Sequence, residues 1–154
     1  MKIKNAVRKD KTDYIKLQKA SFPQTNLNRE SKFFDIKINN SEIFVIEDNK
    51  KYLGHIAFSI NKVEPPFGNS VFIQELAINK ISRGEGLGTK LILALIKYCK
   101  KLKVPVIYLG TGDYKENKTH NFYKRLGFKK IGRLDEIFPD SEYDYGQIFY
   151  GKVI

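Results

Sequence analysis

A glycine-rich stretch, RGEGLGTK at residues 83–90, constrains the fold most strongly because it separates two apolar segments of different periodicity. The segment before it, SVFIQELAI at 70–78, is apolar on both faces of a strand, which is typical of a central strand covered on both sides. The strand period places Val71, Ile73 and Ala77 on one face and Phe72, Leu76 and Ile78 on the other. The segment after it, TKLILALIKYCKKLK at 89–103, carries a single apolar stripe of helical period. This stretch therefore predicts a central strand, a loop and an amphipathic helix.

The rest of the chain extends this unit into one domain. VIYLG at 106–110 follows Pro105 and predicts a second strand, joined to the first by a right-handed crossover that makes the two parallel. Other patterns predict helices over 11–21, 28–39 and about 117–126, a hairpin over 43–61, a loop over 64–70, and strands over 127–133 and 146–154. We predict an α+β or α/β fold with a mixed sheet, as one domain over residues 1–154.

The glycine loop has the features of an anion site. Free backbone N–H groups and the positive end of the helix dipole converge at a helix amino terminus, and glycines allow positive φ angles and close approach. A P-loop is excluded because Gly88 is followed by Thr89 and then Lys90. A dinucleotide fingerprint is excluded because the third glycine position holds Thr89 or Leu91. The loop predicts phosphate or pyrophosphate binding, and a turn that merely caps the helix is the alternative.

Two motifs resemble the GNAT superfamily of acyl-CoA-dependent N-acyltransferases. Arg83, Gly86 and Gly88 match its Q/R-x-x-G-x-G/A motif. NKTHNFYKRLGF at 117–128 is similar to its second motif, N-x-x-A-x-x-x-Y-x-x-x-G-F, at Asn117, Tyr123, Gly127 and Phe128, with one residue fewer between the asparagine and the tyrosine and with His120 in place of the usual alanine. The opening VRKDKTDYIKLQKASF also resembles the family's first strand and helix, so the likeness covers essentially the whole chain.

The resemblance implies a fold, a co-substrate and its contacts. In GNAT domains two parallel strands, here 70–78 and 106–110, splay apart and hold acyl-CoA in the wedge between them. By this resemblance, acetyl-CoA is the expected co-substrate. The main chain of Leu76, Ala77 and Ile78 is implied to bind the pantetheine arm. The implied pyrophosphate contacts are the loop residues Gly84, Gly86, Leu87, Gly88 and Thr89. Arg83 and Asn117, which match the two motifs, are further implied cofactor-binding residues.

Acetyl transfer to an amine needs a base for the ammonium proton and an acid for the departing thiolate. The resemblance implies that the acid is Tyr123; a helix tyrosine that only packs is the alternative. Glu75 is the candidate base because it lies in an apolar strand, on the face predicted for Ile73 and Ala77, and burial raises the pKa of a carboxyl group. A structural partner for a lysine or the backbone is the alternative. We expect His55 and His120 to have packing or surface roles.

Charge and composition limit the partners. The formal net charge is +11, but the lysines are scattered, which favours a solvated surface or a polyanionic small ligand over nucleic acid. DEIFPDSEYDY at 135–145 is acidic and aromatic, so it is either an attractor of a cationic amine or a solvated loop. The two histidines and one cysteine lack metal-ligand spacing, and Cys99 falls on the apolar helix stripe.

The sequence favours a cytoplasmic protein. The longest apolar run, LILALI at 91–96, is too short for a membrane span, no signal peptide pattern is present, and a lone cysteine favours a reducing compartment. We expect a cytoplasmic N-acetyltransferase that acts on a primary amine, either a small molecule or a peptide or protein amino group. A non-catalytic CoA-binding sensor and a basic nucleic-acid-binding module are the alternatives. The sequence leaves the oligomeric state open, a homodimer included.

Overall fold

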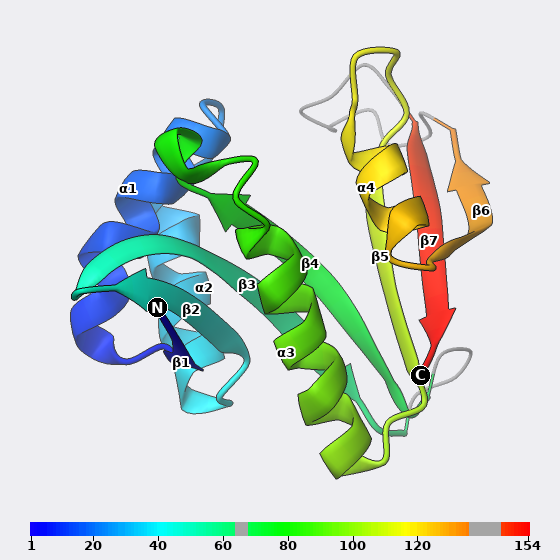
Figure 1. Cartoon of the computed structure of the whole chain (residues 1–154), viewed down its shortest axis with the longest axis horizontal. Coiled ribbons are helices and arrows are strands. Elements are labelled where there is room, and N and C mark those ends of the chain that lie inside the picture. Colours follow the sequence, from blue (N-terminus) through cyan, green and yellow to red (C-terminus); the bar gives the residue numbers. More distant parts are fainter. Residues whose placement is uncertain (64–67, 136–145) are drawn as a thin grey trace.

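The computed structural model describes residues 1–63, 68–135 and 146–154. Within them a single mixed sheet has the strand order β1-β2-β3-β4-β5-β7-β6 (Figure 1). The strands are β1 (Lys2–Asn5), β2 (Ile43–Asp48), β3 (Lys51–Asn61), β4 (Ser70–Ile78), β5 (Val106–Gly112), β6 (Lys129–Leu134) and β7 (Gln147–Val153). The helices are α1 (Lys11–Ser21), α2 (Leu27–Asn39), α3 (Leu87–Leu102) and α4 (Thr119–Arg125), with short 3-10 turns η1 (Arg8–Asp10) and η2 (Lys80–Ser82). The predicted mixed α and β class is confirmed.

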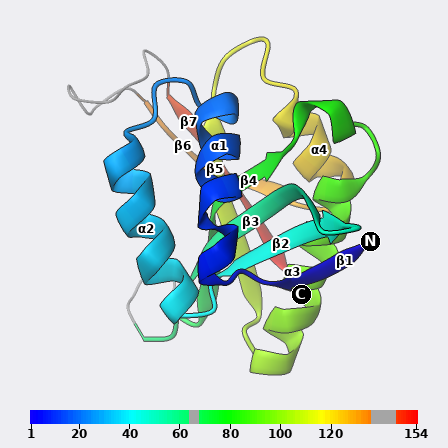
Figure 2. The same ribbon diagram turned by 90° about the vertical axis from the view of Figure 1, so that its left-hand side faces the viewer.

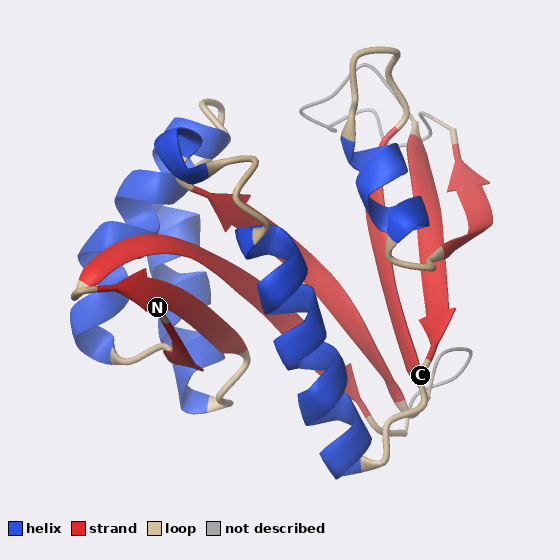
Figure 3. Cartoon of the chain, in the orientation of Figure 1, coloured by secondary structure: helices blue, strands red, loops and turns tan. Residues whose placement is uncertain are grey.

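Helices cover both faces of the sheet (Figures 2 and 3). The apolar stripe of α3 lies in the larger core, where Leu91, Ile92 and Leu95 are fully buried against the strands. Cys99 is also fully buried there, as the helix stripe predicted. α1 and α2 pack in a second core around Tyr14 and Phe34. Across the described residues, no helix has the length and apolar character that a membrane span requires.

The parallel strands β4 and β5 separate along their length. They pair over only four positions, from Ser70–Val106 to Ile73–Leu109, and the rest of β4 has no partner in β5. In Figure 1 the two strands diverge from this junction, with β5, β7, β6 and α4 forming one arm and the remaining elements the other. The predicted parallel crossover and the splayed strands are confirmed.

A β-bulge in β4 changes which side chains share a face. Glu75 pairs with Ala57 and Ile73 pairs with the next residue, Phe58, so Gln74 is an extra residue in β4. Because alternation reverses across such a bulge, Leu76 and Ile78 pack in the same core as Ile73, which places Glu75 and Ala77 on the opposite face. The expectation that Glu75 shares a face with Ile73 is therefore wrong, and the side chain of Glu75 reaches Tyr14 of α1 instead.

A second irregularity shifts the hairpin. Leu53 is the extra residue between the pairs Ile46–Gly54 and Glu47–Tyr52. Tyr52 consequently packs with the α1 and α2 core, while Ile56 packs with α3. Strict alternation over residues 52–60, which the sequence pattern predicted, holds only beyond the bulge.

Candidate active site

The glycine loop follows η2 and runs into the amino terminus of α3. Gly84 has φ +87° and Gly86 has φ +75°, a left-handed conformation that side chains disfavour. Gly86 is the residue before the helix, and no side chain caps it. The amide of Lys90 makes the first helical hydrogen bond, to the carbonyl of Gly86 at 3.0 Å. The preceding amides at the start of α3 have no partner within the helix, and they remain available to an anion.

The three glycines of the loop have different surroundings. A Cβ added to Gly84 or Gly86 would meet no protein atom within 4 Å, so these two positions border open space. A Cβ on Gly88 would lie 3.3 Å from Cζ of Phe122 and 3.8 Å from Cδ2 of Leu76. Gly88 therefore lets α4 pack against the start of α3. The open space at Gly84 and Gly86 leaves room for a ligand, and the binding of a pyrophosphate there stays a prediction.

Two other predicted cofactor residues, Arg83 and Asn117, make hydrogen bonds to strands of the sheet. Nε of Arg83 donates to the carbonyl of Ile78 at 3.0 Å, which ties the loop to the end of β4. Asn117 anchors the start of α4: its Nδ2 donates to the carbonyl of Gly112 at 2.6 Å, and its Oδ1 accepts from the amide of Thr119 at 3.0 Å. The side chain of Asn117 thus has a structural role. Cofactor contacts of these residues remain predictions.

Tyr123 lies on α4, whose neighbouring residue Phe122 packs on Gly88. Its ring is 7% exposed and contacts Phe122 and Phe128 edge to face, with centroids 5.0 and 5.7 Å away. Burial raises the pKa of Tyr123 to about 12. Its hydroxyl is therefore protonated at neutral pH, and none of the described residues hydrogen-bonds to it. It is a proton donor without a competing protein acceptor among those residues.

Glu75 lies at the end of a buried chain of hydrogen bonds. Oη of Tyr14 donates to Oε2 of Glu75 at 2.6 Å and also lies 3.1 Å from Oε2 of Glu30. Glu30 further accepts from Nε2 of Gln18 at 3.0 Å and from Oγ1 of Thr25 at 3.2 Å. Two carboxylates from β4 and α2 thus meet at the hydroxyl of Tyr14.

Burial raises the pKa of Glu75 to about 7, and the negative charge of Glu30 acts in the same direction. The hydrogen bond from Tyr14 opposes this rise because it stabilises the ionised carboxylate. Burial and the two carboxylates also raise the pKa of Tyr14, so that its hydroxyl stays protonated. Glu75 therefore exchanges its proton close to neutral pH, as a base for an ammonium ion must.

Sequence reasoning missed Tyr14, Gln18 and Glu30. Tyr14 and Gln18 are four residues apart, one helical turn, on the face of α1 that meets α2. That spacing was visible, but only the tertiary contact between α1, α2 and β4 shows that the polar groups face one another.

His55 has an acidic neighbour that sequence reasoning did not predict. It is fully buried, its Nε2 lies 3.9 Å from Oε2 of Glu75, and its Nδ1 lies 2.9 Å from Oη of Tyr52. Nε2 has no hydrogen-bond partner among the described residues. Burial lowers the pKa of His55 to about 3, so the ring is neutral. The sequence did not reveal that Glu75 is close to His55, because the bulge at Gln74 determines which β4 side chains face His55.

His120 has the packing role that was expected. Its Nε2 lies 3.0 Å from the carbonyl of Gly112, which can only accept, so Nε2 carries the proton. Its Nδ1 lies 3.0 Å from Oη of Tyr150 and forms a hydrogen bond with it. These two bonds join α4 to β5 and β7.

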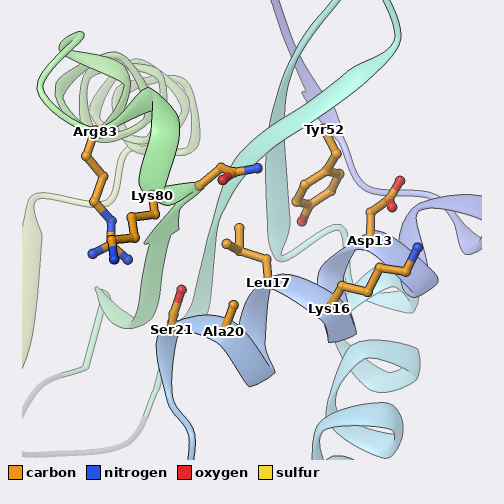
Figure 4. A pocket seen from close by; sticks show the side chains of 9 residues that line it. Asp13, Lys16, Leu17, Ala20, Ser21, Tyr52, Lys80 and Arg83 are labelled. Carbon is orange, nitrogen blue, oxygen red and sulfur yellow. The ribbon is translucent and has the colours of Figure 1, made fainter.

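A pocket of about 430 Å³ lies between α1 and the η2 turn (Figure 4). Figure 4 shows Lys80 and Arg83 on one side of it and Asp13, Lys16 and Tyr52 on the other. Leu17, Ala20, Ser21 and Asn79 complete its lining. The pocket therefore gathers positive charge next to the glycine loop. Among the described residues, no cluster of three or more His, Cys, Asp or Glu side chains is arranged to hold a metal ion.

The acidic segment predicted at 135–145 falls outside the described residues except for Asp135. Oδ1 of Asp135 lies 3.2 Å from Nε of Arg133, which also lies 3.0 Å from Oδ2 of Asp113. Asp135 thus has a local cationic partner on β6. The proposed attraction of this segment for a cationic amine stays a prediction.

Comparison with known proteins agrees with this geometry. The model of the acetyltransferase (GNAT) family matches residues 9–128. An uncharacterized N-acetyltransferase of Methanocaldococcus jannaschii is 36% identical over 97 residues, which are 62% of this chain and 42% of that protein. An N-alpha-acetyltransferase of Sulfurisphaera tokodaii is 28% identical over 153 residues, which are 94% of this chain and 89% of that one.

The fold also matches solved structures. An aminoglycoside 6'-N-acetyltransferase crystallised in complex with coenzyme A superposes with a TM-score of 0.81, covering 99% of this chain and 97% of that one. Its sequence identity of 20% supports the shared fold.

Proposed function

The chain belongs to the GNAT acetyltransferase family, and from this membership we propose that it transfers an acetyl group from acetyl-CoA to a primary amine. One observation carries the proposal. A carboxylate with a pKa near neutrality, Glu75 on β4, and a protonated tyrosine, Tyr123 on α4, lie on the two arms of the wedge. The loop with open space at Gly84 and Gly86 lies beside α4, at the start of α3.

The proposed position of acetyl-CoA follows from the free backbone groups. The edge of β4 beyond Ile73 lacks a partner in β5, so the main chain of residues 76–78 is available to amide groups of the pantetheine arm. The amides at the start of α3 would bind the pyrophosphate. Lys80 and Arg83 add positive charge beside the loop, which favours a polyanionic ligand.

The chain's own groups supply the proton transfers. Acetyl-CoA contributes a thioester, and the reaction forms a C–N bond to the acceptor as the C–S bond breaks. Ionised Glu75 takes a proton from the ammonium group, which frees the lone pair of the nitrogen. Tyr123 gives a proton to the departing sulfur, and the second proton lost by the nitrogen restores the tyrosine. One proton is released overall, from Glu75 to solvent.

Tyr123 needs this coupling because its pKa lies above that of a thiol. A thiol has a pKa of about 8.5, so proton transfer from a tyrosine with a pKa of about 12 to a free thiolate is thermodynamically unfavourable. The transfer becomes favourable when the acidic nitrogen of the attacking amine replaces the lost proton.

The acceptor class is tested with a panel of amines. Relatives named as an N-alpha-acetyltransferase and an aminoglycoside 6'-N-acetyltransferase suggest two classes, the α-amino group of a peptide and the amine of a polycationic small molecule. We would incubate the protein with acetyl-CoA and peptides, polyamines or aminoglycosides, and measure free thiol together with the acetylated product. We expect both to form in equal amounts with one class. Binding of acetyl-CoA without transfer to any amine would favour a CoA-binding sensor instead.

A further inference from the structure

The hydroxyl of Tyr14 lies between two carboxylate oxygens but has only one proton to donate. Its Oη is 2.6 Å from Oε2 of Glu75 and 3.1 Å from Oε2 of Glu30, and the Tyr14 side chain is fully buried. An ionised carboxylate only accepts hydrogen bonds, so Tyr14 satisfies one of its two neighbours at a time. This arrangement gives the cluster two alternative hydrogen-bond patterns.

We propose that Tyr14 reverses its hydrogen bond with Glu75 each time Glu75 gains or loses a proton, with Glu30 as the alternative acceptor. The proposal rests on the role of Glu75 as the base. It makes Tyr14 and Glu30 positioning residues: they act on the acceptor amine through Glu75.

Each protonation state has a complete pattern of bonds. When Glu75 is ionised, the Tyr14 O–H donates to Oε2 of Glu75. When Glu75 is protonated on Oε2, that O–H donates to Oη of Tyr14, and the Tyr14 O–H turns to Oε2 of Glu30. The added proton comes from the ammonium nitrogen and later leaves to solvent, to which the Glu75 side chain is 17% exposed. Rotation about the last side-chain bond of Glu75 presents either oxygen to Tyr14, because this torsion is soft and two-fold.

Glu30 is held in place by donors other than Tyr14. Nε2 of Gln18 and Oγ1 of Thr25 each donate to it, at 3.0 and 3.2 Å, whichever way Tyr14 points. Glu30 therefore offers a fixed acceptor, and its charge raises the pKa of Glu75.

The groups around Glu75 act in opposite directions. The titratable groups that act on it among the described residues are Tyr14 from α1, Glu30 from α2, and Tyr52 and His55 from β3. Burial raises the pKa of Tyr52, so its hydroxyl is protonated and adds no charge. His55 is neutral because burial lowers its pKa to about 3, so it adds no charge. The hydrogen bond from Tyr14 favours ionised Glu75, and the charge of Glu30 favours protonated Glu75. The balance keeps both states within reach at neutral pH.

The reversal is tested in the unmodified protein by carbon-13 NMR, with labels in the Glu side-chain carboxyl and in Cζ of Tyr. The resonance of Glu75 is assigned by its loss in Glu75→Gln, and that of Tyr14 by its loss in Tyr14→Phe. We expect Tyr14 to titrate with the same midpoint as Glu75, near pH 7, and to become independent of pH in Glu75→Gln. A Tyr14 signal that ignores the titration of Glu75 would overturn the proposal.

Two substitutions that nearly preserve shape separate positioning from simple packing. Tyr14→Phe removes the bond to ionised Glu75, so the Glu75 midpoint should rise by about one unit. Glu30→Gln removes the charge, so the midpoint should fall by a similar amount. A purely structural role predicts lower melting temperatures with an unmoved midpoint, which would refute the proposal. The titrations need no acceptor amine, so they are independent of the acetyl-transfer assay. If these pKa shifts occur but no acetyl transfer is found, only the proposed function is contradicted.

Discussion

Replacing Gly86 with alanine isolates the anion loop from the rest of the fold. The new Cβ would meet no protein atom within 4 Å, so the direct structural cost is confined to the backbone at φ +75°. A residue with a side chain in this conformation costs about 1–2 kcal/mol. For a chain of this size, each kcal/mol lowers the melting temperature by about 2–4 °C, so Gly86→Ala alone should melt about 2–8 °C lower.

The effect on acetyl-CoA binding should be larger. Acetyl-CoA at 100 times its dissociation constant should stabilise the wild type by about 2.7 kcal/mol, a rise of about 5–11 °C. The Cβ would occupy the space proposed for the pyrophosphate and displace it from the loop amides. Loss of one or two hydrogen bonds to a charged group costs about 1.5–3 kcal/mol each, which weakens binding on the order of 100-fold. At the same concentration the stabilisation should then fall to about 0.4 kcal/mol.

Differential scanning fluorimetry with and without acetyl-CoA measures both effects. Gly132→Ala is the matched control, because a Cβ there also meets nothing within 4 Å but lies on β6, without a positive φ. It should keep the full stabilisation by acetyl-CoA. An undiminished rise in melting temperature for Gly86→Ala would show that the glycine loop does not hold the pyrophosphate.

Three further predictions follow from the same geometry. Glu75→Gln should lower turnover and leave acetyl-CoA affinity near that of the wild type. It should also remove the loss of activity below pH 7, because only ionised Glu75 accepts a proton. An unchanged pH–rate profile would contradict this. Because the pKa of Glu75 is raised, the folded state binds more protons than the unfolded state between about pH 4.5 and 7. The contribution of Glu75 to the free energy of unfolding is therefore present at low pH and is lost as the pH rises through 7. The difference in unfolding free energy between Glu75→Gln and the wild type should therefore grow by about 3 kcal/mol over that range in urea titrations, and a constant difference would contradict the assignment. Gly88→Val should destabilise the free protein more than Gly86→Ala, because its side chain would press on Phe122, and equal melting temperatures would refute that packing role.

The sequence predicted the parts of the fold that depend on local pattern. The apolar stripe of α3, the parallel direction of the strands predicted at 70–78 and 106–110, and the positive φ angles at Gly84 and Gly86 follow from periodicity and backbone chemistry. The bulge at Gln74 did not follow, because an extra residue in a strand changes the face of every later side chain without a clear signal in the residues themselves.

Individual residues of the proposed site could be predicted from the sequence, but their surroundings could not. Tyr123 was selected by a motif and Glu75 by its place in an apolar strand. The cluster of Tyr14, Glu30 and His55 around Glu75 requires α1, α2 and β3 to meet on one side of β4, which is tertiary information. The titration of Glu75 near pH 7 depends on that cluster, so its side chain could be suspected as a base but its environment could not be derived.

The most direct test of acetyl transfer at this wedge is the rate of the chemical step in Tyr123→Phe. The substitution keeps the ring contacts with Phe122 and Phe128 and removes a hydroxyl that none of the described residues binds, so melting temperature and acetyl-CoA affinity should stay near those of the wild type. Single-turnover measurement with the acceptor found in the amine panel should then show a rate about 10²–10⁴-fold lower, the usual contribution of a general acid. A rate within about threefold of the wild type would mean that Tyr123 only packs and would contradict this account of the mechanism.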